Sequence, residues 1–455
     1  MHIHILGVGG TFMAGIATLA KAKGHKVTGS DNKIYPPMSD ILDELGIKVA
    51  EEYDVSVFDD RPDLVVIGNA LSRGNLAVEY VLSNRIPYIS GPEWLKNNIL
   101  QDRFVIAVAG THGKTTVSSL VAWLFESAGL KPGFLIGGVP ENFDVCARLG
   151  QSDYFIIEAD EYDTAFFDKR SKFIHYQPNI LIINNLEYDH ADIFDSLQDI
   201  VRQFHHLIRT MSADSVIVFP SDYTEIEQLI KLGCWSKTET FGSKQSDTWM
   251  VNFEELSEKK ITLTTRDGTV FKVPTPLLGL HNAWNVAAAL GALALVTKDL
   301  QHTINQLPLF ANASRRLQLI GTPRAIRVYD DFAHHPSAIA SSLTAIKKYV
   351  NTKKLIAVLE LRSNTMVMGV HKSTLAAALE SADLILVLKP TDLKWDLADA
   401  LKTLSNVVIA EESQVIVQKV ADIAEKGDSV IIMSNGASEN LPTRIIQQIE
   451  VIETI

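Results

Sequence analysis

The chain has 455 residues, a length that accommodates about three domains of roughly 150 residues each. Its residues are 46% hydrophobic and 21% charged, which excludes a disordered, collagen-like or coiled-coil chain. Lys and Arg number 42 against 54 Asp and Glu, a formal net charge of −12, and without a basic excess we do not expect nucleic-acid binding.

Cysteine content and apolar stretches indicate a cytoplasmic protein. Cys146 and Cys234 are the only cysteines and lack metal-ligand spacing, which suits a reducing compartment, although the sequence leaves one disulfide open. The first seven residues contain neither a basic segment nor a long apolar segment, so no signal peptide is expected. The apolar stretch 283–297 is too short to cross a bilayer. We expect no membrane segment and a monomer or weak homo-oligomer.

Apolar runs alternate with amphipathic segments along the whole chain, the pattern of α/β domains with parallel sheets. The first block, 1–101, is expected to contain a helix over 11–23 and strands at 2–6, 26–29, 64–67 and 87–89. The block 102–313 is expected to contain helices over 117–127 and 282–296, strands at 104–109, 154–157, 180–183 and 216–219, and antiparallel strands within 238–273. The block 314–455 is expected to contain strands at 326–329, 355–359, 384–388 and 429–433.

The first turn of the chain favours a bound diphosphate. Gly7, Gly9 and Gly10 follow the first expected strand and resemble a dinucleotide fingerprint, although Phe12 stands at its sixth position. Asp31 lies about 20 residues further on, where a ribose-binding carboxylate belongs in that fingerprint. A nicotinamide-dependent dehydrogenase is therefore an alternative, weakened by Phe12 and by a second nucleotide signal in the next block.

The second nucleotide signal is a phosphate-binding loop, residues 109–116 with the sequence A-G-T-H-G-K-T-T, between an expected strand and an expected helix. Glycines let backbone N–H groups close on phosphate oxygens at the helix N-terminus. Lys114 would reach the β- and γ-phosphates and Thr115 would bind Mg²⁺. Val108 stands where the general pattern has a further glycine, so the loop is a variant, and the alternative is a chance sequence in a surface turn.

Two acidic clusters follow expected strands of the same block, at 158–163 (E-A-D-E-Y-D) and 187–192 (E-Y-D-H-A-D). Ligands bind at the carboxyl edge of open α/β sheets, and carboxylate oxygens suit Mg²⁺. The alternative for either cluster is a solvated acidic loop. In the last block, Asp331 with His334 and His335 has the composition of a zinc site, but no further spaced ligand is evident.

Taken together, these motifs resemble the Mur ligase family of peptidoglycan synthesis over essentially the whole chain. The matching pieces are G-V-G-G, G-T-H-G-K-T-T, E-A-D-E-Y-D, E-Y-D-H-A-D, L-G-L-H-N-A-W-N, S-R-R-L-Q and D-D-F-A-H-H-P. The resemblance implies three α/β domains: a Rossmann-like N-terminal domain for a UDP-linked muramoyl substrate, a central P-loop domain for ATP, and a Rossmann-like C-terminal domain for the incoming amino compound.

Further stretches are similar to the branch of this family that recycles a whole murein peptide. These are 35–38, 90–94, 137–140, 166–173 and 360–366. The resemblance implies an ATP-dependent ligase that joins L-Ala-γ-D-Glu-meso-diaminopimelate to UDP-N-acetylmuramate through an acyl phosphate, with domain closure over the reacting groups. The alternatives are the UDP-N-acetylmuramate–L-alanine ligase of the same family and a P-loop ATPase or switch with a regulatory nucleotide in the first block.

The resemblance also implies roles for individual residues. ATP contacts are expected from Gly110, Thr111, His112, Gly113, Lys114, Thr115, Thr116, Asn282, Asn285, Arg316 and Asp331. Catalytic roles fall to Lys114, Glu158, His190 and Arg316, and Mg²⁺ ligands are Thr115 and Glu158 for one ion and His190 for a second. Substrate contacts are expected from Gly7, Gly9, Gly10, Asp31, Ser72 and Arg362.

Some of these roles are specific. Asn282 and Asn285 would meet the adenine region, Arg316 the γ-phosphate and Asp331 the ribose. Arg362 is expected to grip a peptide carboxylate in a bidentate fork, although a surface arginine is the alternative. Sister ligases carry a carbamylated lysine near the position where this chain has His205. Because histidine stands there, no carbamate is expected in this chain.

Overall fold

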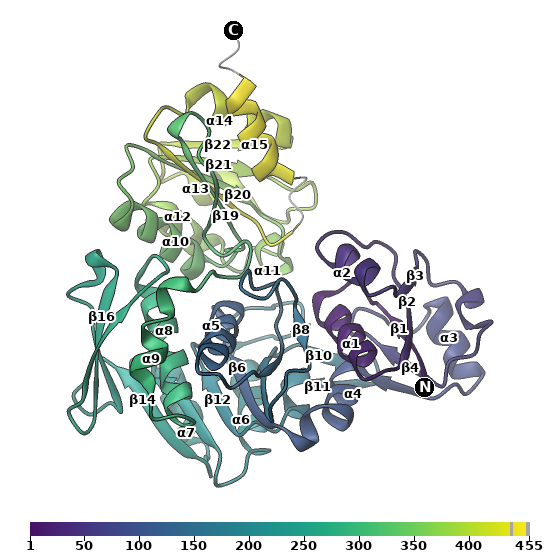
Figure 1. The fold of residues 1–455 in the computed structure, drawn as a ribbon. Coiled ribbons are helices and arrows are strands. Elements are labelled where there is room, and N and C mark those ends of the chain that lie inside the picture. The colour runs from purple at the N-terminus through teal and green to yellow at the C-terminus, as the bar shows by residue number, and fades with distance from the viewer. Residues whose placement is uncertain (437–439, 452–455) are drawn as a thin grey trace.

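Three β-sheets, each built from a separate stretch of the sequence and covered by helices, organise the chain (Figure 1). The computed structural model describes residues 1–436 and 440–451. In Figure 1 the N-terminal domain, in purple, lies beside the middle domain, and the C-terminal domain, in light green and yellow, lies above the middle domain. The prediction of three α/β domains with mainly parallel sheets is confirmed.

The N-terminal domain contains five parallel strands in the order β3-β2-β1-β4-β5. The strands are β1 (His2–Leu6), β2 (Lys26–Ser30), β3 (Lys48–Ala50), β4 (Leu64–Ile67) and β5 (Tyr88–Ser90). The helices are α1 (Thr11–Ala22), α2 (Met38–Glu44), α3 (Leu76–Ser83) and α4 (Gly91–Asn98), with 3-10 turns η1 (Val55–Phe58) and η2 (Leu100–Asp102). Residues 3–6 and 65–67 are buried because helices cover both faces of a parallel sheet.

The middle domain is built on ten strands in the order β17-β16-β15-β14-β13-β12-β6-β9-β7-β8. These strands are β6 (Phe104–Ala109), β7 (Gly133–Leu135), β8 (Ala147–Arg148), β9 (Tyr154–Glu158), β12 (Ile180–Ile183), β13 (Val216–Pro220), β14 (Lys237–Gly242), β15 (Trp249–Asn252), β16 (Lys260–Thr265) and β17 (Val270–Pro274). A separate hairpin pairs β10 (Asp163–Ala165) with β11 (Asp168–Ser171). Within the ten-stranded sheet, only β15–β17 and the β7–β8 pair are antiparallel, so the expected antiparallel segment is shorter than 238–273.

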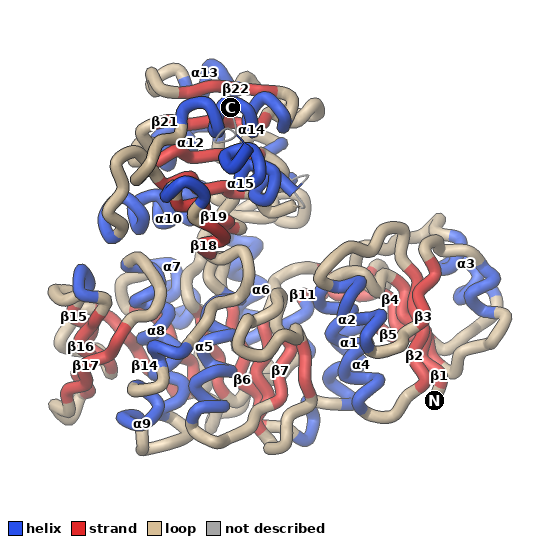
Figure 2. The backbone as a smooth tube through the Cα atoms, turned by 45° about the horizontal axis from the view of Figure 1, so that its top comes forward, coloured by secondary structure: helices blue, strands red, loops and turns tan. Residues whose placement is uncertain are grey.

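Helices pack on both faces of the middle sheet, as Figure 2 shows. They are α5 (Lys114–Ser127), α6 (Leu197–Ile208), α7 (Thr224–Lys231), α8 (Leu280–Ala294) and α9 (Leu300–Ile304), with 3-10 turns η3 (Lys172–His175), η4 (Leu256–Glu258) and η5 (Leu307–Leu309). Helix α8, rich in alanine and leucine, packs against α5 in the core, as expected for an apolar helix too short to span a membrane.

The C-terminal domain has six strands in the order β18-β19-β23-β20-β21-β22, parallel except for β18. They are β18 (Gln318–Gly321), β19 (Arg327–Asp331), β20 (Leu355–Glu360), β21 (Leu384–Leu388), β22 (Val407–Ala410) and β23 (Ser429–Met433). The helices are α10 (Pro336–Tyr349), α11 (Asn364–Val367), α12 (Lys372–Leu379), α13 (Leu397–Leu401), α14 (Ser413–Ile423) and α15 (Leu441–Val451), with the 3-10 turn η6 (Pro323–Ala325).

The N-terminal and middle domains share one apolar core. Helix α1 packs on β8, and a side chain at Gly15 would press on Leu135 and Ala147 at 3.2 and 3.3 Å. This contact brings the first turn of the chain close to the carboxyl edge of the middle sheet. At that edge β12, β6 and β9 are neighbours, so the loops that follow them converge.

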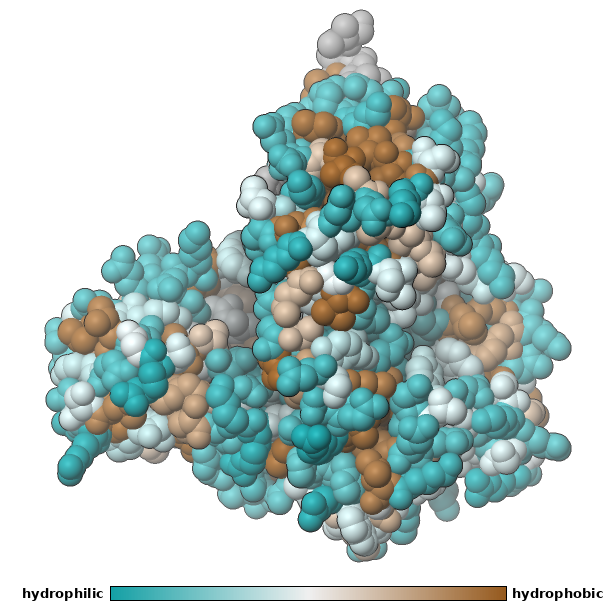
Figure 3. Space-filling model, turned by 180° about the vertical axis from the view of Figure 1, so that it is seen from behind, coloured by the Kyte–Doolittle hydropathy of each residue, from teal (hydrophilic) through white to brown (hydrophobic). Residues whose placement is uncertain are grey.

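Seen from behind, the surface is mainly polar with separate apolar patches (Figure 3). Within residues 1–436 and 440–451, no helix is long and apolar enough to cross a membrane. Both cysteines are free, Cys146 in the buried core and Cys234 partly exposed, so the disulfide left open by the sequence is not formed.

Candidate active site

The loop between β6 and α5 has the backbone of an anion cradle. Gly110 and Gly113 have φ of +134° and +77°, which residues with side chains rarely adopt. A Cβ on Gly110 would lie 3.0 Å from the Asn185 backbone oxygen, and one on Gly113 would lie 2.8 Å from the Asn184 amide nitrogen. Only glycine fits at both positions, and the fourteen-residue helix α5 starts directly after the loop. The loop therefore presents a helix N-terminus and backbone donors suited to a phosphate group.

Two asparagines at the end of β12 hold this loop in place. The side chain of Asn185 accepts a hydrogen bond from the His112 N–H at 2.7 Å and donates to the His112 carbonyl at 2.9 Å. Asn184 donates to Asn285 at 3.0 Å, and Asn285 donates in turn to Asn282. Asn282 and Asn285, the predicted adenine-binding residues, are thus connected by hydrogen bonds to Asn184 at the end of β12. No motif predicts a role for Asn184 and Asn185, and their only signal in the sequence is their position directly after a buried strand.

Lys114 is buried in an ion pair at the start of α5. Its Nζ donates to Glu161 Oε2 at 3.0 Å and to the Gly110 carbonyl at 2.8 Å, and it lies 3.7 Å from Asp160 Oδ1. Burial alone would lower the pKa of Lys114, but the charges of Glu161 and Asp160 outweigh it and raise the pKa. Burial acts against the Glu161 carboxylate, yet Lys114 and His190 lower its pKa to about 2. Both groups are therefore charged at neutral pH.

Thr115 and Glu158 supply paired oxygen atoms beside that ion pair. The Thr115 hydroxyl donates to Glu158 Oε1 at 3.0 Å, and Glu158 Oε2 accepts the Gly137 N–H at 2.7 Å. Burial, followed by the charge of Asp160, raises the pKa of Glu158. A buried hydroxyl and carboxylate are the donor types that Mg²⁺ prefers, so this pair fits a magnesium ion.

Arg316 connects the C-terminal domain to the loop. Its guanidinium donates to the Thr115 hydroxyl at 2.8 Å and lies 4.7 Å from the centre of the Phe332 ring. Burial lowers the pKa of Arg316, while the carboxylates of Glu158 and Asp331 oppose this effect. The structure therefore places a predicted γ-phosphate ligand from one domain on the phosphate loop of another.

His190 lies on the other side of Glu161. Its backbone is left-handed, with φ of +55°, and its Nε2 lies 3.3 Å from Glu161 Oε1. Burial would lower the pKa of His190, but the hydrogen bond and charge of Glu161 raise it. Glu161, whose only signal in the sequence is its place in an acidic cluster, thus joins Lys114 to His190.

The second acidic cluster docks the C-terminal domain. Asp189 accepts a hydrogen bond from the Thr365 hydroxyl at 3.0 Å, and Asp192 accepts one from the Asn364 amide at 3.0 Å. Both partners belong to α11, which follows Arg362. This contact could not be predicted, because its two halves lie more than 170 residues apart in the sequence. The contact holds Arg362 near the middle domain, where its side chain is exposed and lies 3.4 Å from Glu360.

Three possible metal ligands converge at the same domain boundary, but they are not the expected trio. Donor atoms of His112, Glu187 and His335 lie within 4.8 Å of one another, and this is the single such group in the described part of the chain. Asp331, His334 and His335 do not form such a group in the described residues, and the Asp331 carboxylate instead accepts a hydrogen bond from the Ser342 hydroxyl. Burial, followed by the charge of His112, lowers the pKa of His335 to about 3.

In the N-terminal domain, Asp31 holds the glycine turn. Its carboxylate accepts the Gly9 N–H at 2.8 Å and the Tyr53 hydroxyl at 3.2 Å. Gly7 has φ of +82°, and Gly10 lies at the N-terminus of α1. Ser72 is exposed in the loop after β4, next to Leu71, which borders Gly7. Asp31 thus holds the turn formed by Gly7, Gly9 and Gly10, and Ser72 follows the residue that borders this turn.

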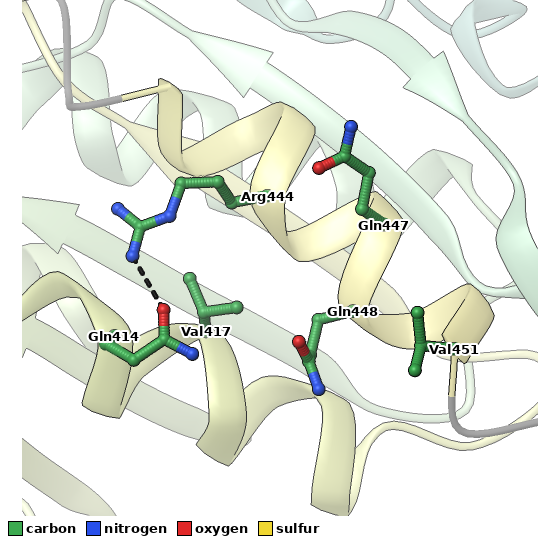
Figure 4. A pocket seen from close by; sticks show the side chains of 6 residues that line it. All are labelled: Gln414, Val417, Arg444, Gln447, Gln448 and Val451. Carbon is green, nitrogen blue, oxygen red and sulfur yellow. Dashed lines mark hydrogen bonds between the residues drawn. The ribbon is translucent and has the colours of Figure 1, made fainter.

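Two other features lie apart from this site. His205 packs against Trp235, with ring centres 6.3 Å apart. A depression between α14 and α15 is lined by the six residues of Figure 4 and includes a hydrogen bond from Arg444 to Gln414 at 2.8 Å. None of the six belongs to the groups described above.

Comparisons with known proteins agree with this architecture. Three family models match consecutive parts of the chain: "Mur ligase family, catalytic domain" at 2–103, "Mur ligase middle domain" at 108–293 and "Mur ligase, glutamate ligase domain" at 315–436. The UDP-N-acetylmuramate–L-alanyl-γ-D-glutamyl-meso-2,6-diaminoheptandioate ligase of Escherichia coli (strain K12) is 47% identical over 451 residues, 98% of each chain.

Two further relatives extend the comparison. The UDP-N-acetylmuramate–L-alanine ligase of Paenarthrobacter aurescens (strain TC1) is 31% identical over 95% of this chain and 94% of its own. The crystal structure of a murein peptide ligase from Psychrobacter arcticus 273-4 superposes with a TM-score of 0.77 at 39% identity, covering 99% of each chain.

Proposed function

The chain belongs to the Mur ligase family, and from that premise we propose that it joins the tripeptide L-Ala-γ-D-Glu-meso-diaminopimelate to UDP-N-acetylmuramate at the expense of ATP. The observation that carries the chemistry is the contact of Arg316 with Thr115, which brings a cation of the C-terminal domain onto the phosphate loop of the middle domain. The choice of a tripeptide is supported by 47% identity to a ligase named for it, against 31% to an alanine ligase.

The proposed domains are 1–101 for the UDP-linked sugar, 102–313 for ATP and 314–455 for the peptide. ATP supplies the energy by converting the lactyl carboxylate of the sugar into an acyl phosphate, which an amine can attack. Lys114 and Arg316 would neutralise the phosphate oxygens that the glycine loop orients, and such transfer depends mainly on positioning and charge. Because ATP and UDP-sugars are made inside the cell, the proposed site of action is the cytoplasm.

Magnesium ions would complete this site. Thr115 and Glu158 would hold one ion and His190 a second, so that positive charge faces the transferred group. Glu161 raises the pKa of His190 by stabilising its protonated form, so a metal ion bound to His190 would displace that proton. Asn282 and Asn285 would border the adenine, Asp331 the ribose, and Arg362 a carboxylate of the peptide.

The competing function is the addition of free L-alanine by the same chemistry. Phosphate release from ATP in the presence of UDP-N-acetylmuramate, with either L-alanine or the tripeptide as partner, distinguishes the two. We expect release with the tripeptide, matched by amide product. Release with L-alanine alone would favour the competing function, and release without any amine would indicate an ATPase.

A further inference from the structure

Lys172 is a buried cation without a close partner. It begins η3, directly after the β10–β11 hairpin, and 6% of its surface is exposed. The nearest acidic atom to its Nζ is Asp160 Oδ2 at 3.9 Å, which is beyond hydrogen-bond distance. Across residues 1–436 and 440–451, no hydrogen bond from this Nζ is found. Its backbone is fixed, because the Lys172 N–H donates to the Tyr162 carbonyl at 2.9 Å.

The surroundings of this ammonium compensate its charge incompletely. The rings of Phe12 and Tyr162 lie 4.9 and 5.2 Å from Nζ, and cation–π attraction is weaker than a hydrogen-bonded ion pair. Asp160 is shared, because its other oxygen lies 3.7 Å from Lys114. Burial lowers the pKa of Lys172, with the charge of Asp160 opposing this effect. A buried cation of this kind favours an incoming anion that can accept its hydrogen bonds.

The position of Lys172 specifies which anion can reach it. Its helical turn η3 packs on α4 of the N-terminal domain, and Phe12 is the second residue of α1, just after the glycine turn. On the other side, Lys172 and Lys114 flank the same carboxylate, Asp160. Lys172 therefore stands between the domain proposed to carry the UDP-sugar and the loop proposed to carry the γ-phosphate.

We propose that Lys172 binds the lactyl carboxylate of UDP-N-acetylmuramate and holds it against the phosphate loop. This assignment rests on the proposed function and names the group that orients its nucleophile. Two anions, the carboxylate and the γ-phosphate, must approach each other before reaction, and a lysine facing each of them offsets their repulsion. The alternative is that Lys172 serves only as a structural counter-ion of Asp160.

A comparison of two nucleotide sugars by titration calorimetry separates these roles. UDP-N-acetylglucosamine lacks the lactyl group and its carboxylate but is otherwise the same ligand. Lys172→Met is expected to weaken binding of UDP-N-acetylmuramate about tenfold to a hundredfold, the usual effect of losing a charged hydrogen bond, and to leave UDP-N-acetylglucosamine unchanged. Lys172→Gln, which keeps a polar end group but removes the charge, should behave in the same way and replaces the Met variant if that variant does not fold.

Lys169→Met is the matched control. Lys169 lies three residues earlier in the same stretch, its side chain is 70% exposed, and it pairs with Asp163 at 2.7 Å. This variant should bind both sugars as the unmodified protein does. Unchanged affinity of Lys172→Met and Lys172→Gln for UDP-N-acetylmuramate would overturn the assignment, and so would an equal loss for both sugars. If the unmodified protein formed no amide from UDP-N-acetylmuramate, the proposed function itself would fail, which these binding ratios do not decide.

Discussion

Replacing Lys114 with methionine should lower both the free energy of unfolding and the rate of ligation, and comparison with a double variant separates the two effects. Lys114 and Glu161 are 8% and 2% exposed at their side chains, and their charged atoms lie 3.0 Å apart. Removing one partner of a buried ion pair usually lowers the free energy of unfolding by about 3–5 kcal/mol, because the other charge is left uncompensated. His190 still lies 3.3 Å from Glu161, so we expect the lower end of this range, about 3 kcal/mol.

A double variant provides the control. In Lys114→Met with Glu161→Gln, no buried carboxylate is left without its partner, so stability should return to within about 1 kcal/mol of the unmodified protein. Ligation should stay at least about a hundredfold slow in both variants, because the charge that faces the phosphates is absent from each. Urea unfolding followed by tryptophan fluorescence measures the first quantity, and phosphate release measures the second.

Two results would refute this reasoning. Recovery of activity in the double variant would mean that Lys114 acts only as the partner of Glu161. Equal free energies of unfolding for the single variant and the unmodified protein would mean that His190 alone compensates the charge of Glu161.

Three further predictions concern other parts of the molecule. Arg316→Met should lower kcat by about a hundredfold while UDP-N-acetylmuramate binding stays unchanged. Weaker binding of UDP-N-acetylmuramate with an unchanged kcat would indicate that Arg316 contacts the sugar and not the γ-phosphate of ATP. Chelation of divalent ions with EDTA should stop phosphate release and excess Mg²⁺ should restore it, whereas metal-independent turnover would contradict the roles of Thr115 and Glu158. Burial lowers the pKa of His4 from the ordinary histidine value of 6.5 to about 4, so its contribution to stability is present above pH 6.5 and lost as pH falls toward 4. Between pH 7.5 and 5 the unmodified protein should therefore lose about 2 kcal/mol more than His4→Gln in urea unfolding, and parallel pH profiles would contradict this.

Much of the fold could be predicted because strong apolar periodicity marks its central strands. The strands β1, β4, β6, β12, β21 and β23 begin and end where the sequence indicated. Edge strands were missed, since β3, with three residues, and β18, whose side chains are partly exposed, are too short or too polar to show a period. Helix α5 starts three residues earlier than expected because the loop glycines place Lys114 already in helical conformation.

Residues of the candidate site could be predicted where a single sequence motif indicates their function. Contacts between residues that are distant in sequence were harder to predict. Lys114, Thr115 and Glu158 meet because neighbouring parallel strands end at one edge of the sheet. The link from Glu161 to His190 and the docking of α11 depend on side chains that only tertiary packing brings together. Lys172 carried no signal in the sequence beyond its place in a stretch resembling the family, because its burial arises from two domains at once.

The proposed reaction depends most on the carboxylate of the sugar becoming an acyl phosphate. The direct measurement uses UDP-N-acetylmuramate with oxygen-18 in the lactyl carboxylate, ATP, the tripeptide and mass spectrometry of the released phosphate. One labelled oxygen should appear in each phosphate, because amide formation leaves that oxygen on phosphorus. Phosphate that carries no label, released together with amide product, would contradict the account.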